Sequence, residues 1–250
     1  MILTRKYLED TYEDLFFIKD LYLNYNEITS LEKDVFKGLT SLEILSISDN
    51  KITSLDKDIF KDLNSLQILS FHNNKITFLD KDIFKGLTSL ERLYLNNNEI
   101  ISLDKDIFKD LTSLENLSIS INKITSLDKN TFKGLTSLKR LYFHNNKITF
   151  LDKDIFKDLN LLKLRIDNNE IFFLHKDVFK HLTSLEYLKF DSNQITSLHK
   201  DIFKNLTSLE HLYLYDNKIT KIKTFKNFII YKCIGEYRDK LEKTISYYSF

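Results

Sequence analysis

Asparagine recurs along this chain at a fixed interval that spans most of its length. Nine Asn residues are spaced 24 positions apart at every step except one, where the step is 23. They are Asn26, Asn50, Asn74, Asn98, Asn122, Asn146, Asn169, Asn193 and Asn217. The short step contains residues 159–161, where a linker that reads LTSL or LNSL in the other units is shortened to LNL. A fixed period of this size predicts a repeat architecture.

The residues around each Asn repeat with it. In residues 42–65 the apolar positions are Leu42, Leu45, Ile47, Ile52, Leu55, Phe60 and Leu63. The L-x-L core has a period of two, so apolar side chains point inward and the residues between them point outward, as in a strand. A single unit cannot bury its apolar face, so stacked units are predicted to share one core and one parallel sheet. The stretch FHNNKITFLDKDIFK occurs at both 71–85 and 143–157, three units apart, which indicates duplication of a three-unit block.

This pattern resembles the leucine-rich repeat, L-x-x-L-x-L-x-x-N-x-L, and more closely its typical 24-residue subclass, without cysteine-rich caps. The resemblance covers residues 18–222, as eight full units and a truncated ninth. It implies an α/β repeat solenoid, shaped as a leucine-rich repeat horseshoe. The parallel β-sheet would form the concave face, with irregular or short helical turns on the convex face.

Three columns of equivalent residues are predicted to have structural roles. The repeat Asn amides are expected to pair with backbone groups of the loops, because a buried amide needs partners. A second inward column consists of Phe36, Phe60, Phe84, Phe108, Phe132, Phe156, Phe179 and Phe203. Two residues after each Phe stand Gly38, Asp62, Gly86, Asp110, Gly134, Asp158, His181 and Asn205. These residue types tolerate positive φ best, so a left-handed turn is predicted at this third column.

The two ends depart from the repeat and are interpreted as caps. Residues 1–17 are predicted to form a degenerate half-repeat, with Tyr7, Tyr12 and Leu15 in the slots of Leu31, Phe36 and Leu39. In residues 223–250 apolar residues recur at helical spacing, which predicts a C-terminal capping helix over 226–248. A helix that lies on a membrane surface or binds a partner is the alternative for that segment.

Composition limits the classes of protein to which the chain can belong. It has 250 residues, a net charge of +1 and a single cysteine, Cys233, so an intramolecular disulfide is excluded. The near-neutral charge gives no bias toward nucleic acid or anionic membranes. The sequence has no pattern typical of a signal peptide or a membrane-spanning helix. We therefore expect a monomer in the cytoplasm (the host cytoplasm if the source is viral), with no nucleic-acid or membrane partner.

Candidate catalytic and metal-binding residues are few. The four glycines do not form a phosphate-binding loop, and Cys233 is interpreted as a packing residue of the predicted helix. His175 and His199 occupy equivalent positions in adjacent units, so two imidazoles could meet there, but no third ligand is evident. Columns of Asp are interleaved with Lys, which favours a charged surface over a calcium site. No enzyme activity, cofactor or metal is predicted.

The outward strand positions are the predicted binding surface. There the chain carries Tyr22, Arg92, Tyr94, Arg140, Tyr142, His144, Lys163, Arg165, Tyr187, Lys189, Tyr213 and Tyr215. Tyr and Arg are favoured anchors of protein interfaces. These residues predict a non-catalytic protein–protein interaction scaffold whose partner is an acidic or mixed-charge protein surface. Four alternatives stay open: an unselected solvated face, a substrate-recognition adaptor of a multi-subunit enzyme complex such as a ubiquitin ligase, an extracellular receptor-type ligand-binding domain, and a polyanion-binding face.

Overall fold

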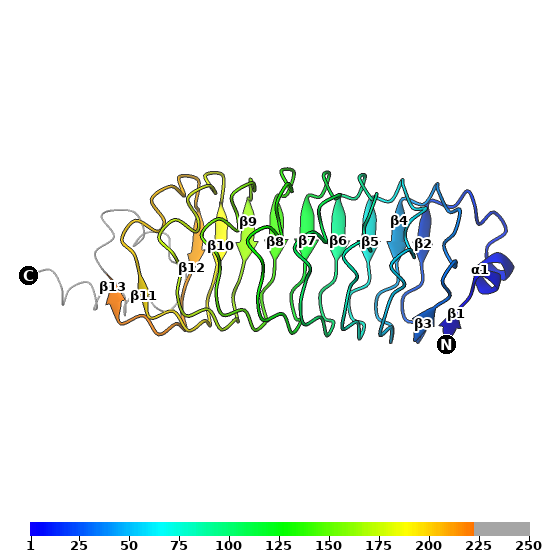
Figure 1. The fold of residues 1–250 in the computed structure, drawn as a ribbon, viewed down its shortest axis with the longest axis horizontal. Coiled ribbons are helices and arrows are strands. Elements are labelled where there is room, and N and C mark those ends of the chain that lie inside the picture. The colour runs from blue at the N-terminus through cyan, green and yellow to red at the C-terminus, as the bar shows by residue number, and fades with distance from the viewer. Residues whose placement is uncertain (223–250) are drawn as a thin grey trace, which may run out of the picture.

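Nine short parallel strands lie side by side and form the central sheet of the protein (Figure 1). The computed structural model describes residues 1–222, so the predicted C-terminal helix lies outside the described residues. The strands are β2 (Asp20–Tyr22), β4 (Ile44–Ser46), β5 (Ile68–Ser70), β6 (Arg92–Tyr94), β7 (Asn116–Ser118), β8 (Arg140–Tyr142), β9 (Lys163–Arg165), β10 (Tyr187–Lys189) and β12 (His211–Tyr213). Their order in the sheet follows the sequence from β2 to β12, and every pair joins equivalent repeat positions. The predicted parallel sheet is therefore confirmed.

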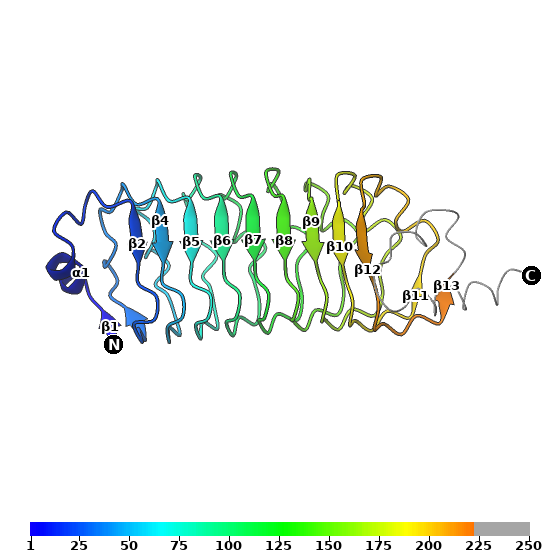
Figure 2. The same cartoon turned by 180° about the vertical axis from the view of Figure 1, so that it is seen from behind.

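Two smaller parallel sheets lie near the ends of the described chain, where β1 (Ile2–Leu3) pairs with β3 (Ser30–Leu31) and β11 (Ser197–Leu198) pairs with β13 (Lys221–Ile222). Within residues 1–222 the one helix, α1 (Arg5–Thr11), lies at the N-terminal end (Figures 1 and 2). Its N-cap is Thr4, whose hydroxyl accepts a hydrogen bond from the Tyr7 N–H.

The first residues do not keep the predicted repeat register. Leu3, rather than Tyr7, pairs with Leu31, and Tyr7 is exposed. The cause is α1, which advances the chain by only about 1.5 Å per residue and so shifts the repeat positions. Tyr12 does pack against the core, and Leu15 is buried in it.

One continuous core runs the length of the solenoid behind the sheet. In the central sheet, the middle Leu of each strand from β2 through β4 to β10 is fully buried. The Phe column is also buried, and neighbouring rings pack with centroids about 6 Å apart, as between Phe84 and Phe108 at 6.2 Å. Phe71, Phe143 and Phe190 extend from the ends of their strands into this column. Because each ring contacts rings of the next unit, the core stabilises the stacking of units as well as each unit.

The repeat Asn side chains connect consecutive loops, as Asn50 illustrates. Its Nδ2 donates to the carbonyl oxygens of Leu23, Ile47 and Ser48, and its Oδ1 accepts from the Ile28 N–H. The same kinds of bond recur at the other internal Asn residues. Each amide therefore satisfies buried backbone groups of its own unit and of the preceding one. Removing such a partner costs about 1–3 kcal/mol.

The predicted position of the left-handed turn is correct only at its glycines. Gly38, Gly86 and Gly134 have φ of 75°, 80° and 82°, but none of the Asp, His or Asn residues in that column has positive φ. At such a position the side chain has another role: Asp62 Oδ2 accepts a hydrogen bond from the Gly38 N–H of the preceding unit. The recurrent left-handed residue directly precedes each repeat Asn. These residues are Tyr25, Asp49, Asn73, Asn97, Ile121, Asn145, Asn168, Ser192 and Asp216.

Candidate ligand-binding face

The outward side chains of the central sheet form one continuous surface, which we call the sheet face. It consists of the first and third residues of each strand and the second residue after each strand. All twelve predicted partner-binding residues lie on it. The parallel register places Tyr142 beside Arg165, Arg165 beside Lys189, and Lys189 beside Tyr213. Residues that are about 24 positions apart in the sequence are therefore direct neighbours.

Two carboxylates are buried beneath the cations of β9 and β10. Asp167 and Asp191 are each only 1% exposed. Arg165 binds Asp167 through two hydrogen bonds, with Nε 3.0 Å from Oδ1 and Nη2 2.9 Å from Oδ2. The Lys189 Nζ lies 3.4 Å from Asp191 Oδ2 and 3.9 Å from Asp167 Oδ2. Much of the positive charge on these two strands is thus compensated within the protein.

The two carboxylates differ in how completely they are paired. Asp167 has the bidentate Arg165 and a further bond from Asn168 Nδ2. Within residues 1–222 neither oxygen of Asp191 has a hydrogen bond of good geometry, and the Lys189 ammonium and the Tyr215 hydroxyl are its weaker partners. Burial therefore raises the pKa of Asp191 to about 6, although the Lys189 ammonium offsets part of that effect. On the neighbouring loop, burial and the Arg165 charge lower the pKa of His144 to about 4.

Tyrosine rings surround these charges. Tyr187 and Tyr213 pack with centroids 5.3 Å apart, and the Lys163 Nζ lies 6.0 Å from the centre of the Tyr187 ring. The Lys189 Nζ lies 5.8 Å from the Tyr213 ring and 5.9 Å from the Tyr215 ring. Ammonium groups at this range are attracted to the ring faces. The result is a packed array of aromatic and cationic side chains over β9, β10 and β12.

Three cations on the sheet face have no carboxylate partner among the described residues. Arg92, Arg140 and Lys163 each occupy the first position of a strand, and none of them forms an ion pair within residues 1–222. Arg140 donates only to the Asn116 side chain, at 3.2 Å. Within residues 1–222, these three are therefore the cations of the sheet face that no carboxylate contacts as an ion pair.

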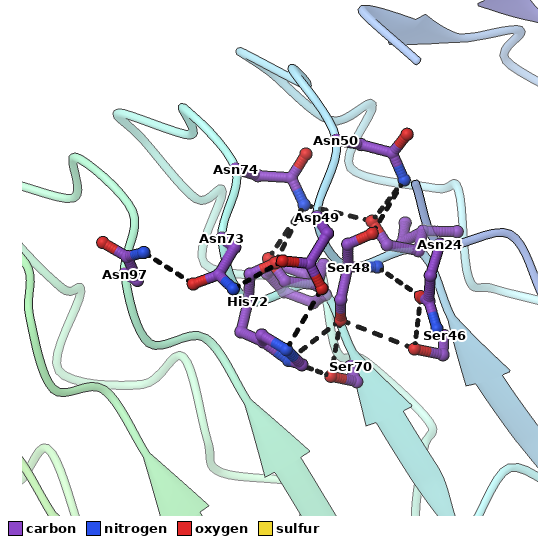
Figure 3. A network of polar contacts seen from close by, with 12 residues as sticks. Asn24, Ser46, Ser48, Asp49, Asn50, Ser70, His72, Asn73, Asn74 and Asn97 are labelled. Atoms are coloured by element: carbon purple, nitrogen blue, oxygen red, sulfur yellow. Dashed lines mark hydrogen bonds and ion pairs between the residues drawn. The ribbon is translucent and has the colours of Figure 1, made fainter. Parts of the chain in front are cut away.

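The other half of the sheet face has a different composition, shown in Figure 3. Ser46, Ser48 and Ser70 are buried on the outer side of β4 and β5. Ser48 Oγ lies 2.8 Å from Ser70 Oγ and 2.9 Å from His72 Nδ1, and Ser46 Oγ donates to Asn24 Oδ1. Small hydroxyl side chains here satisfy one another and the neighbouring amide, so little of their polarity is left for solvent.

One contact in this network has the residue types of a hydrolase triad. Ser70 Oγ lies 2.7 Å from His72 Nδ1, while His72 Nε2 lies 3.6 Å from Asp49 Oδ2. The His–Asp distance exceeds that of a hydrogen bond, and Ser70 and Ser48 are 6% and 0% exposed. A nucleophile must reach its substrate, so the arrangement is a structural polar network rather than a catalytic site.

The residues considered as metal ligands cap turns. The Nδ1 atoms of His175 and His199 accept from the backbone N–H of Asp177 and Asp201, as Asp56 Oδ1 does from Asp58 in an earlier unit. Residues 1–222 contain no group of three or more His, Cys, Asp or Glu side chains arranged to hold a metal ion. Nor does any helix within that range have the length and apolarity needed to cross a membrane.

A row of exposed apolar residues was missed by sequence reasoning. It lies just after the repeat Asn positions, outside the sheet face, and comprises Phe78, Ile101, Phe150, Phe172 and Phe173. Phe78 and Phe150 occupy the slot that holds Ser54 and Ser126 in other units, so a change from Ser to Phe at one repeat position was the available signal. The backbones of Phe150 and Phe173 pair as an isolated parallel bridge.

The solved structures that resemble this fold belong to longer proteins. The TLR13–ssRNA13 complex matches with a TM-score of 0.69 and 29% identity, over 78% of this chain and 32% of that chain. The Toll–Spatzle complex of Drosophila matches with a TM-score of 0.65 and 23% identity, over 81% of this chain and 31% of that chain. Its glycosylated form matches with a TM-score of 0.74 and 26% identity, over 81% and 27% of the two chains.

These matches confirm the predicted horseshoe solenoid, and the chain spans less than a third of the length of the solved proteins it resembles. A comparison with curated protein sequences gave no significant match. The leucine rich repeat model matches residues 18–76, 65–124, 112–164 and 159–219, which is well over half of the chain. With the asparagine ladder, the phenylalanine core and the parallel sheet described above, this match shows that the chain belongs to the leucine-rich repeat family.

Proposed function

We propose that this protein is a non-catalytic scaffold that binds a protein partner through the sheet face, on the concave side of the horseshoe. The observation that carries the proposal is the alignment of Tyr142, Tyr187 and Tyr213 with Arg165, Lys163 and Lys189 on adjacent strands. Large aromatic residues beside Arg or Lys are typical anchors of protein interfaces.

The side chains of this surface are already held in place, which favours binding. Arg165 is fixed by Asp167, and Lys189 lies between two carboxylates and two tyrosine rings. Side chains that are ordered before binding lose less entropy on association. Arg92, Arg140 and Lys163, which have no ion pair in the described part of the chain, would face acidic groups of the partner and accelerate the encounter.

The proposal also includes the cellular location of the scaffold and the kind of complex in which it would act. A single cysteine in 250 residues suits a reducing compartment, so we place the scaffold in the cytoplasm as a monomer. An adaptor that delivers substrates to an enzyme complex such as a ubiquitin ligase would use the same face. A receptor-type ligand-binding domain is the alternative suggested by the likeness to Toll and TLR13.

Single-stranded nucleic acid is a second candidate ligand. Arg92, Arg140 and Lys163 form no ion pair with a carboxylate of residues 1–222, and one structure that resembles this chain is a complex with single-stranded RNA. Phosphate binding of this kind weakens steeply as salt increases. A protein partner held by tyrosine anchors would be less sensitive to salt.

The test is an affinity capture from cell lysate at low and high salt with three baits. The first bait is the intact protein. The second carries Arg92→Asn, Tyr94→Ser, Arg140→Asn, Tyr142→Ser and Lys163→Asn, which copy Asn116 and Ser118 of β7 and should leave the core unchanged. The third bait removes three cations outside the sheet face, Lys57, Lys81 and Lys129, each changed to Asn.

A protein that is captured by the first and third baits but lost from the second supports the proposal. Equal capture by all three baits contradicts binding through the sheet face. Recovery of RNA that disappears at high salt would favour the second candidate.

A further inference from the structure

The sheet has an open edge at its N-terminal end. β2 is the terminal strand, and within residues 1–222 it pairs only with β4. The short strand β1 covers β3 instead, and Met1 bonds to the backbone of Glu27 and Thr29, so these residues leave β2 uncovered. An uncovered parallel strand presents a row of backbone donors and acceptors.

The direction of those groups follows from the repeat. Lys19 O and the Leu23 N–H bond to β4, so odd-numbered residues of this segment face the sheet. Backbone groups alternate sides along a parallel strand, so the N–H and C=O groups of Asp20 and Tyr22 point away from β4. These are the groups that another strand would use.

Asn26, the first of the repeat Asn residues, forms fewer side-chain hydrogen bonds than the internal ones such as Asn50. Asn50 Nδ2 donates to three carbonyl oxygens and its Oδ1 accepts from the preceding unit. Asn26 Nδ2 donates only to Asn24 O, and no other described residue bonds to the Asn26 amide side chain. An acceptor and spare donor capacity therefore lie beside the open edge.

Exposed aromatic residues are concentrated at this end. Half of the fourteen large hydrophobic residues that are exposed within the described part of the chain fall in its first 25 positions. Phe17 and Tyr25 are each 78% exposed, and Tyr22 and Phe16 are 57% and 53% exposed. Phe17, Tyr22 and Tyr25 span the length of β2 and its flanks. Grouped exposed apolar side chains are typical of interaction sites.

The charge at this end is acidic. Asp10, Glu13, Asp14 and Asp20 are exposed and have no ion pair within residues 1–222. Of the nearby cations, Arg5 pairs with Glu9 and Lys19 pairs with Glu43, so these four carboxylates are opposed only by Lys6 and the N-terminal ammonium among residues 1–25. The surface around β2 therefore complements a basic segment and would repel an acidic one.

We propose that the β2 edge binds an extended, basic segment of another protein, which adds a tenth strand to the sheet. Its alternate apolar side chains would pack against Phe17, Tyr22 and Tyr25, while its backbone would bond to Asp20 and Tyr22. This mode of recognition gives affinity through the main chain and specificity through alternate side chains. The site is separate from the middle and far strands of the sheet face, on which the proposed function rests.

The position of the N-terminal cap favours a single strand over a second copy of the protein. Figures 1 and 2 both show α1 farther out along the solenoid axis than β2. Two copies meeting end to end would bring their caps and their acidic residues against each other. A single extended segment needs only the width of one strand, about 4.8 Å.

The test uses two synthetic peptides taken from the protein's own repeats. LKRLYFHNNKI copies residues 138–148 and carries three cations, and LEILSISDNKI copies residues 42–52 with the same apolar frame but two carboxylates and one lysine. Fluorescence anisotropy with the full chain should show at least about tenfold tighter binding of the basic peptide. Hydrogen exchange should show new protection at the Asp20 and Tyr22 amides when that peptide is bound.

Asp20→Pro removes an outward N–H without touching the bonds to β4, and it should weaken binding by about tenfold or more. Asp20→Asn is the matched control, since it keeps the backbone donor; its loss should be about threefold or less. Thermal unfolding checks that both variants fold. Undiminished binding by Asp20→Pro, or no protection of the β2 amides, would overturn the proposal. A dimer of the chain that Asp20→Pro abolishes would overturn the choice of occupant.

Discussion

The two halves of the sheet face carry different side chains at equivalent positions of the repeat. On β4 and β5 the third strand position and the loop position after it hold Ser46, Ser48, Ser70 and His72. On β9 and β10 the same positions hold Arg165, Asp167, Lys189 and Asp191. Both sets lie over an identical frame of Leu, Ile and Phe. In each half a residue of the loop position is almost fully buried, with Ser48 at 0% and Asp167 and Asp191 at 1%.

The comparison shows that this position buries the small side chains Ser48, Asp167 and Asp191 in both halves, although the larger Tyr215 is 41% exposed there. The energetic consequence of that burial depends on the side chain. A buried hydroxyl needs one or two hydrogen bonds, which neighbouring serines provide. A buried carboxylate needs a cation, and the loss of that cation leaves a charge in a poorly solvated site. The charged half should therefore be more sensitive to mutation, pH and salt than the serine half.

The largest effect is expected from Arg165→Ala. It removes both hydrogen bonds to the buried Asp167 and leaves only Asn168 and the distant Lys189 ammonium. We expect the free energy of unfolding to fall by about 3 kcal/mol, as when one partner of a buried ion pair is deleted. Urea denaturation followed by circular dichroism measures this change.

Two controls relate that result to the serine half. Arg165→Ser combined with Asp167→Ser copies Ser46 and Ser48, and it should restore stability to within about 1 kcal/mol of the wild type. Ser48→Ala deletes the matching group of the serine half and should cost only about 1 kcal/mol. A double variant as unstable as Arg165→Ala would show that the uncompensated carboxylate is not the cause.

Acidification should change the contributions of His144 and Asp191 to the stability of the charged half in opposite directions. The pKa of His144 is lowered from 6.5 to about 4, so the stability it contributes is lost as the pH falls through that range. The pKa of Asp191 is raised from 3.8 to about 6, so its contribution is present below that range and lost as the pH rises through about 6. Between about pH 6 and pH 4 the two effects oppose each other.

Variants at these two positions should separate the effects. Relative to the wild type, His144→Ser should gain about 1–2 kcal/mol in stability between about pH 7 and pH 4.5, after allowance for solvent screening. Asp191→Asn should lose a similar amount over the same interval. Urea denaturation at several pH values gives both differences. Identical pH profiles for the wild type and both variants would contradict this assignment.

The smallest expected effect is at the boundary between the halves. Ile121 has a φ of 53°, which is strained for a β-branched residue. Side-chain hydrogen bonds link the equivalent residues Asp49, Asn73 and Asn97 (Figure 3), and Ile121 cannot continue this row. Ile121→Asn copies the equivalent Asn97 and should stabilise the protein by about 0.5–1 kcal/mol. Ile101→Asn, at an exposed residue without positive φ, is the control and should give no gain in thermal stability.

The repeat core was predictable from the sequence because its cause is local and recurs in every unit. The L-x-L spacing, the Asn and the Phe each specify an inward position, and the stacking of identical units brings these positions into register. The residues of the sheet face followed from the same alternation. The left-handed turn was misassigned because Asp and Asn suit that backbone conformation as well as they suit hydrogen bonding to the preceding unit.

By itself, the sequence determined the solenoid, the length of its repeat, its core columns and which side chains face outward. Only the tertiary structure decided which outward charges are neutralised, since Arg165 pairs with Asp167 of its own unit and Lys189 reaches the same carboxylate from the next unit. It also decided that the chain's first strand covers β3 and leaves the edge of β2 open. The physical reason is the same in both cases. A pattern that repeats in every unit can be read from its period, whereas a contact that is made once, such as that of Lys189 with Asp167 or of β1 with β3, leaves no period in the sequence.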